Sequence, residues 1–98
     1  MGKVTEQQFF ESVDQAEPPA GLAPQLLAIR HGLRGEWDAA HRIVQALDDA
    51  DAAWVHAWLH RVEGDESNAG YWYRRAGRPV GTGSTDSEGR AIAAALLG

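Results

Sequence analysis

The segment "AWVHAWLHRVEGD", residues 53–65, carries the clearest structural signal in the chain. Its two tryptophans and its two histidines each lie four residues apart, so each pair projects from one side of a helix. Alanine, valine and leucine fill the remaining sides, and the helix predicted over residues 51–63 is therefore apolar nearly all round. A helix of this kind is normally central and buried. We therefore expect the rest of the fold to pack around it.

The composition limits the classes of protein that fit the sequence. A chain of 98 residues is predicted to form one domain, and its net charge of −5 argues against a nucleic-acid partner. The absence of cysteine excludes disulfides and cysteine-ligated metal sites. No apolar run approaches the ~20 residues that span a bilayer, so no membrane association is expected. A cytoplasmic location is the default expectation.

The residues before and after the turn at Gly64 occur twice in the chain. Residues 27–47 align with residues 56–76 at an offset of 29, which places His31 on His60 and Gly35 on Gly64. Each copy reads as a helix, a glycine-containing turn and a second helix. The glycines stand where a helix needs a left-handed stop, and the residue after Gly64 is suited to cap the next helix.

This repeat resembles the tetratricopeptide and Sel1-like helical repeats, over residues 22–79. Its period is shorter than the ~34 residues of the tetratricopeptide family, and the shortening falls in "DDAD", residues 48–51. The sequence of residues 56–79 also resembles that of small uncharacterised bacterial proteins with an HAxLHRxEGDxxNAxYWYRRAGRP-like segment. The resemblance implies tandem helical hairpins and carries no implied activity.

The whole chain is predicted to be all-α, a compact bundle of five to six helices with two tandem TPR-like hairpins. A capping-box pattern at Thr5 opens a first helix that is expected to run to about Ala16. In the second helix, Arg30 and Arg34 are expected to face water. The predicted parts of the single domain 1–98 are an N-terminal helix and Pro-rich turn (1–21), a first hairpin (22–48), a second hairpin (51–79), a flexible linker (80–85) and a C-terminal helix (86–98).

Histidines supply one candidate site. His56 and His60 project from one side of their helix, and two imidazoles at this spacing can bind one metal ion. His41 on the neighbouring helix is a possible third ligand and Glu63 a possible fourth. The alternative is that these rings lie in the interior with their nitrogens hydrogen-bonded, and Tyr73 or a backbone carbonyl is a candidate partner.

A second candidate site is a groove. By resemblance to the tetratricopeptide family, the first helix of each hairpin lines a concave surface that binds peptides or apolar ligands. The predicted groove residues are Trp54, Trp58, Arg61, Gln25 and Ile29. The alternative is that the first or last helix folds over this face and buries it.

A third candidate is an outward-facing patch of Tyr71, Arg74, Arg75 and Arg78, since arginine can bind carboxylates or phosphates through two hydrogen bonds. Nothing in the sequence specifies a substrate or a cofactor. We therefore interpret the protein as a non-catalytic module that binds a protein or peptide, or itself. The alternative is a small metal or acid–base site built on His41, His56 and His60.

Overall fold

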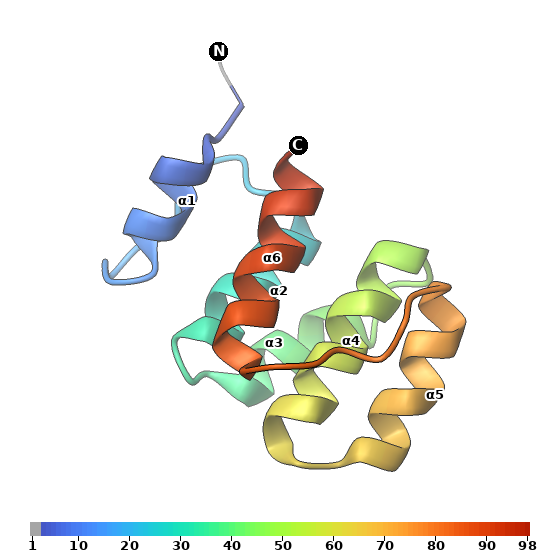
Figure 1. The fold of residues 1–98 in the computed structure, drawn as a ribbon. Coiled ribbons are helices and arrows are strands. Elements are labelled where there is room, and N and C mark those ends of the chain that lie inside the picture. The colour runs from blue at the N-terminus through green and yellow to red at the C-terminus, as the bar shows by residue number, and fades with distance from the viewer. Residues whose placement is uncertain (1–2) are drawn as a thin grey trace.

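A computed structural model describes residues 3–98, which form six α-helices and no strand (Figure 1). The helices are α1 (Glu6–Ser12), α2 (Pro24–Leu33), α3 (Trp37–Val44), α4 (Ala50–Glu63), α5 (Glu66–Ala76) and α6 (Thr85–Leu97). The predicted all-α class is confirmed. Within this described part of the chain, every helix is too short or too polar to cross a membrane.

The two copies of the repeat form two helical pairs. The most extensive contacts between elements join α4 to α5 and α2 to α3. Gly35 and Gly64 end the first helix of each pair with φ of +79° and +89°, a conformation that glycine adopts without steric cost. In both turns the following N–H donates to the carbonyl five residues back, at 2.9 Å. These pairs are consistent with tandem hairpins, and the tetratricopeptide resemblance stays a prediction.

Helix starts follow local capping chemistry. Thr5 and Gln8 exchange side-chain and backbone hydrogen bonds in a capping box at α1. Asp65 accepts the backbone N–H of Asn68 at α5, as its place after Gly64 predicts. Helix α4 starts in the same way at Asp49.

Helix α4 occupies the centre of the fold, as its apolar surface predicts. It contacts α2, α3, α5 and α6, and its residues Val55, Trp58 and Leu59 are buried. Helix α6 packs against α4 and α2 and also contacts α1 (Figure 1). Its buried residue Ile92 joins the main core. The last helix is therefore an integral part of the core.

Helix α1 is shorter than predicted, because two arginines satisfy the carbonyls at its end. It ends at Ser12, and the prediction of a helix to about Ala16 is wrong. Arg30 donates to the carbonyls of Ser12 and Gln15, and Arg34 donates to those of Val13 and Gln15. The expectation that Arg30 faces water is also wrong, since it is only 2% exposed.

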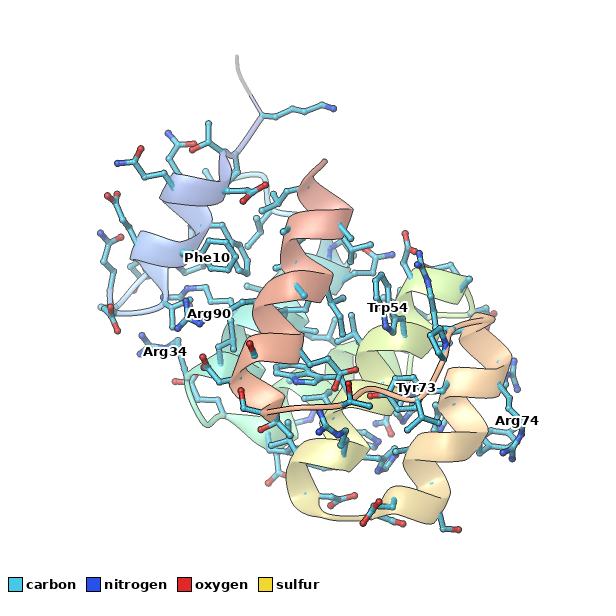
Figure 2. All side chains as sticks on the ribbon, viewed as in Figure 1. Phe10, Arg34, Trp54, Tyr73, Arg74 and Arg90 are labelled. Carbon is cyan, nitrogen blue, oxygen red and sulfur yellow. The ribbon has the colours of Figure 1, made fainter. Side chains whose placement is uncertain are left out.

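The segment before α6 is held in place by contacts to α4 and α5. Arg61 donates to the carbonyl of Gly83 and pairs with Glu88 at 2.8 Å. Tyr73 donates its hydroxyl proton to the same carboxylate at 2.5 Å. Figure 2 shows Tyr73 directed towards this segment, whereas Arg74 points outward. Residues 80–84 lie outside any helix, and α6 begins at Thr85, one residue before the predicted start of the C-terminal helix.

Candidate metal centre

Three of the four histidines meet between α3 and α4. His41 extends from α3, and His56 and His60 extend from successive turns of α4. One ring nitrogen of each lies within 4.8 Å of one ring nitrogen of both others. The Nε2 atoms of His41 and His56 are 3.0 Å apart, and the rings of His56 and His60 stack with centroids 4.9 Å apart. We refer to His41, His56 and His60 as the histidine triad.

Two tryptophans flank the triad. Trp37 stacks on His41 with ring centroids 4.6 Å apart, and Trp72 stacks on His56 at 3.9 Å. The indole N–H of Trp37 donates to a backbone carbonyl of α4 at 2.6 Å, which fixes the orientation of its ring. His56 and His60 are only 4% and 7% exposed, while His41 is half-buried. The triad is therefore enclosed by aromatic rings and by helix α4 itself.

Each triad ring has a hydrogen-bond partner, as expected for buried imidazoles. His41 and His56 bond each other, and Nδ1 of His60 lies 2.7 Å from Oε2 of Glu63. Tyr73, a candidate partner from the sequence, donates its proton to a residue of α6 instead. Because two of the rings bond only to each other, the triad lacks the carbonyl partners that the sequence analysis considered.

The environment of the triad favours neutral rings. The pKa of His56 is lowered from 6.5 to about 4, chiefly by burial and then by the neighbouring imidazoles of His41 and His60. The pKa of His41 is lowered chiefly by burial and then by His60. Both rings are therefore neutral near pH 7, which is the protonation state that a metal ion requires of a histidine ligand.

The geometry fits a small divalent transition metal ion. A tetrahedral ion at about 2.0–2.1 Å from each nitrogen holds its ligand nitrogens about 3.3 Å apart. The 3.0 Å separation between the Nε2 atoms of His41 and His56 is close to this value, and one ring nitrogen of His60 lies within 4.8 Å of a nitrogen of each. Imidazole nitrogen suits zinc, copper, nickel and iron, whereas magnesium and calcium prefer oxygen ligands. The donor set and its spacing therefore point to the first group.

Glu63 lies outside the triad, although the sequence suggested it as a fourth ligand. Its carboxylate contacts Nδ1 of His60 and forms a separate group of possible ligand atoms with His60 and Asp65. Asp65 uses its carboxylate to bond the backbone and side chain of Asn68. The structure thus brings together three of the four residues proposed as metal ligands and places the fourth behind one of them.

The predicted groove is covered by α6, which is the alternative that the sequence left open. Trp58 is only 1% exposed, and its indole N–H donates to the carbonyl of Thr85 at 2.7 Å. The indole lies between α2 and α6, so close that a Cβ on Gly89 would stand 2.3 Å from its Cζ2. Ile29 is fully buried. The expectation of an open surface at Trp58 and Ile29 is therefore wrong for this fold.

The other three groove residues each contact a residue of the same chain. These contacts are Arg61 with Glu88 at 2.8 Å, Gln25 with Asp49 at 3.0 Å, and Trp54 with the guanidinium of Arg78 at 3.9 Å from its ring centroid. The five residues thus contribute to the packing around α4, through contacts to α6, to the start of α4 and to the segment after α5.

The arginine patch does lie on the surface, as predicted. Arg74, Arg75 and Arg78 are exposed, and Tyr71 is 44% exposed. Arg75 donates to the hydroxyl of Tyr71 at 3.2 Å. Among residues 3–98, no carboxylate lies within ion-pair distance of these three arginines. The patch therefore forms no ion pair with Asp65 or Glu66 at the start of the same helix.

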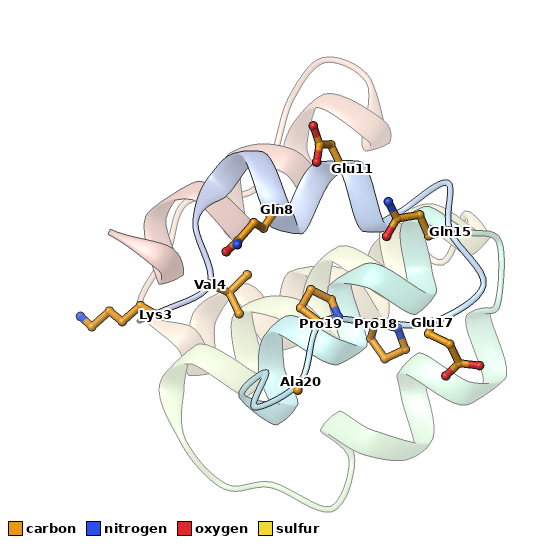
Figure 3. A pocket seen from close by; sticks show the side chains of 9 residues that line it. All are labelled: Lys3, Val4, Gln8, Glu11, Gln15, Glu17, Pro18, Pro19 and Ala20. Atoms are coloured by element: carbon orange, nitrogen blue, oxygen red, sulfur yellow. The ribbon is translucent and has the colours of Figure 1, made fainter. Parts of the chain in front are cut away.

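Three surface hollows are lined by residues other than the triad histidines. The first, of about 450 Å³, is formed by α1 and the proline turn and is lined by Lys3, Val4, Gln8, Glu11, Gln15, Glu17, Pro18, Pro19 and Ala20 (Figure 3). The second, of about 370 Å³, includes the outer part of Trp72, and the third, of about 200 Å³, lies beside Leu96 and Leu97. None of the three is lined by a histidine, although the 370 Å³ hollow is lined in part by Trp72, whose ring stacks on His56.

Sequence reasoning missed the role of Trp72 beside the triad. Trp37 precedes His41 by four residues, which places both on one side of their helix, and in the structure their rings stack. Trp72 reaches His56 only because α5 folds back on α4, which no local pattern specifies. Compared with known proteins, the chain matches no family model, no curated protein and no solved structure.

Proposed function

We propose that this protein binds a late first-row transition metal ion, zinc foremost, through His41, His56 and His60. The observation that supports this proposal is the convergence of three imidazole nitrogens within 4.8 Å, contributed by two packed helices. Three histidines around an ion leave a fourth position for water or another small ligand. A metal site explains why three polar rings lie where the fold could have buried apolar side chains.

The alternative is that the three rings only form a polar cluster within the core. Two neutral imidazoles that share one N–H···N bond satisfy one nitrogen each, and this bond stabilises a fold by only about 0.5–1.5 kcal/mol. Three apolar side chains of similar size would avoid the desolvation of three polar rings altogether. A core cluster therefore gives little reason for the third ring of His60 to face the pair formed by His41 and His56.

The role that fits this site is retention of a metal ion within the fold. None of the hollows described above is lined by a triad histidine, and two of the three ligand rings are almost fully buried. Bound metal would join α3 of the first hairpin to α4 of the second and so stabilise the packing between the two hairpins. A catalytic role would need a substrate position beside the ion, and the proposal assigns no reaction.

Isothermal titration of the tag-free, metal-stripped protein with zinc tests this proposal. We expect one ion per chain, with binding weakened by much more than tenfold in His41→Ala, His56→Ala and His60→Ala. His31→Ala is the matched control, because His31 also hydrogen-bonds a glutamate but lies outside the triad. Equal zinc affinity in all four variants would mean that the ion binds elsewhere or adventitiously.

A second candidate function is binding of an acidic protein segment at the arginine patch. It is supported by three exposed arginines that pair with no carboxylate among the described residues, in a chain of net charge −5. Self-association would use the same charge complementarity. Sedimentation at micromolar concentration, at low and high salt, tests self-association. A salt-sensitive dimer that is lost in Arg74→Glu supports self-association, and a protein that is monomeric at both salt concentrations excludes it.

A further inference from the structure

The carboxylate of Glu63 holds the outer nitrogen of a triad ring. Its Oε2 lies 2.7 Å from Nδ1 of His60, and Glu63 is three residues further along α4, at the helix end. The histidine is nearly buried, whereas the glutamate is partly exposed. An ionised carboxylate is an acceptor only, so the ring nitrogen in this contact must carry the proton.

This contact determines which nitrogen of His60 is available to a metal ion. With the proton on Nδ1, the lone pair of the neutral ring lies on Nε2. The edge of the ring opposite Glu63 is therefore the one that can donate electrons to an ion. His41 and His56 complete the triad around His60, with ring centroids 5.3 Å and 4.9 Å from its own.

We propose that Glu63 is a positioning residue for the metal site: it fixes the orientation and tautomer of His60 so that Nε2 binds the ion. This inference rests on the proposed metal-binding function. A carboxylate behind a histidine ligand also strengthens the ligand, because it stabilises the partial positive charge that the ring acquires on binding a cation. Glu63 thus acts on the ion through His60 and is not itself a ligand.

A second histidine–glutamate pair elsewhere in the chain, with a similar N–O distance, separates this role from a purely structural one. Nδ1 of His31 lies 2.8 Å from Oε1 of Glu36, and His31 occupies the position in the first repeat that His60 occupies in the second. No other histidine accompanies His31 in a group of possible metal ligands among residues 3–98. The Glu36 pair therefore provides a matched control with the same chemistry and no triad.

The test compares zinc binding by the full chain and the variants Glu63→Gln, Glu63→Ala and Glu36→Gln. We expect zinc affinity to fall by about 10- to 100-fold in both Glu63 variants, the usual effect of losing such a partner, and to be unchanged in Glu36→Gln. Nitrogen chemical shifts of the imidazoles supply a second measurement. In the zinc-loaded wild type, His60 should be bound through Nε2 and protonated on Nδ1.

The outcomes distinguish this inference from the proposed function. Zinc binding that depends on the triad, but stays within twofold of wild type in both Glu63 variants, would overturn the role of Glu63 and leave the metal site intact. A zinc-bound Nδ1 of His60 would overturn it equally. Absence of triad-dependent zinc binding in the wild type would remove the metal site and this inference together.

Discussion

The substitution Gly89→Ala tests the packing of α6 against α4. A Cβ added at Gly89 would lie 2.3 Å from Cζ2 and 2.8 Å from Cε2 of the Trp58 indole. The ring has no free side to which it can retreat, because a Cβ on Gly32 of α2 would in turn stand 2.6 Å from its Cζ3. The indole N–H is also bonded to the carbonyl of Thr85. Alanine at position 89 must therefore move a helix.

Two opposing effects set the size of the change. Replacing glycine by alanine inside a helix stabilises it by up to about 1 kcal/mol. Overpacking of a buried side chain costs about 1–3 kcal/mol, and the tight fit on both faces of the indole places this site at the upper end. We therefore expect Gly89→Ala to lower the free energy of unfolding by about 2 kcal/mol. For a domain of this size, that corresponds to a fall in Tm of roughly 8–16 °C.

Thermal and urea unfolding, followed by circular dichroism, measure this change. Gly70→Ala is the control, because that glycine also lies within a helix and its added Cβ would meet only Arg74, at an ordinary 3.6 Å. The control should be slightly more stable than wild type. In a Trp58→Phe background, Gly89→Ala should cost at least about 1 kcal/mol less, since the outer ring atoms are gone. A Gly89→Ala protein as stable as the Gly70→Ala protein would refute the reasoning.

Two further predictions concern buried polar groups. The stability of the metal-free protein should fall as the pH is lowered from about 6.5 towards 4. In that range the unfolded chain protonates His56, whereas the folded chain, in which the pKa of His56 is about 4, does not. The loss in the free energy of unfolding amounts to at most about 3 kcal/mol. His56→Gln should flatten this profile, and an equally steep profile in that variant would contradict the assignment. Arg30→Met should cost about 2–4 kcal/mol and expose α1 to hydrogen exchange, because it leaves the carbonyl of Ser12 without its side-chain donor and that of Gln15 with Arg34 alone. Arg34→Met should cost less, since Arg34 is partly exposed, and equal protection of α1 in the wild type and both variants would exclude this role for the arginines.

Features of the fold that depend on neighbouring residues were predictable from the sequence. The capping box at Thr5, the stops at Gly35 and Gly64 and the cap at Asp65 each involve groups within a few residues of one another. The central position of α4 followed from its apolar surface, because a helix without a polar face cannot remain exposed. These local patterns were enough to establish the all-α class.

Features that depend on distant parts of the chain were harder to predict. Arg30 looked solvent-exposed by helical periodicity, and its burial follows from the carbonyls that α1 presents to it. The face of Trp58 looked like a groove, because the pattern of α4 does not reveal that α6 contains a glycine at the point of crossing.

The histidines show the same division. The side shared by His56 and His60 was predictable from their spacing, and His41 was a possible third member. How the three rings meet depends on the angle between α3 and α4, which the sequence pattern does not specify. Glu63 was placed near His60 by its spacing, but the rotamers determine that it contacts Nδ1 and stays outside the triad.

The most direct measurement of the central claim is anomalous X-ray diffraction, at the zinc edge, from crystals of the protein grown with one equivalent of zinc. The account predicts a single strong peak between α3 and α4, about 2.0–2.1 Å from one nitrogen of each triad imidazole. Full zinc occupancy at any other position, with the His41–His56 hydrogen bond still in place, would contradict it.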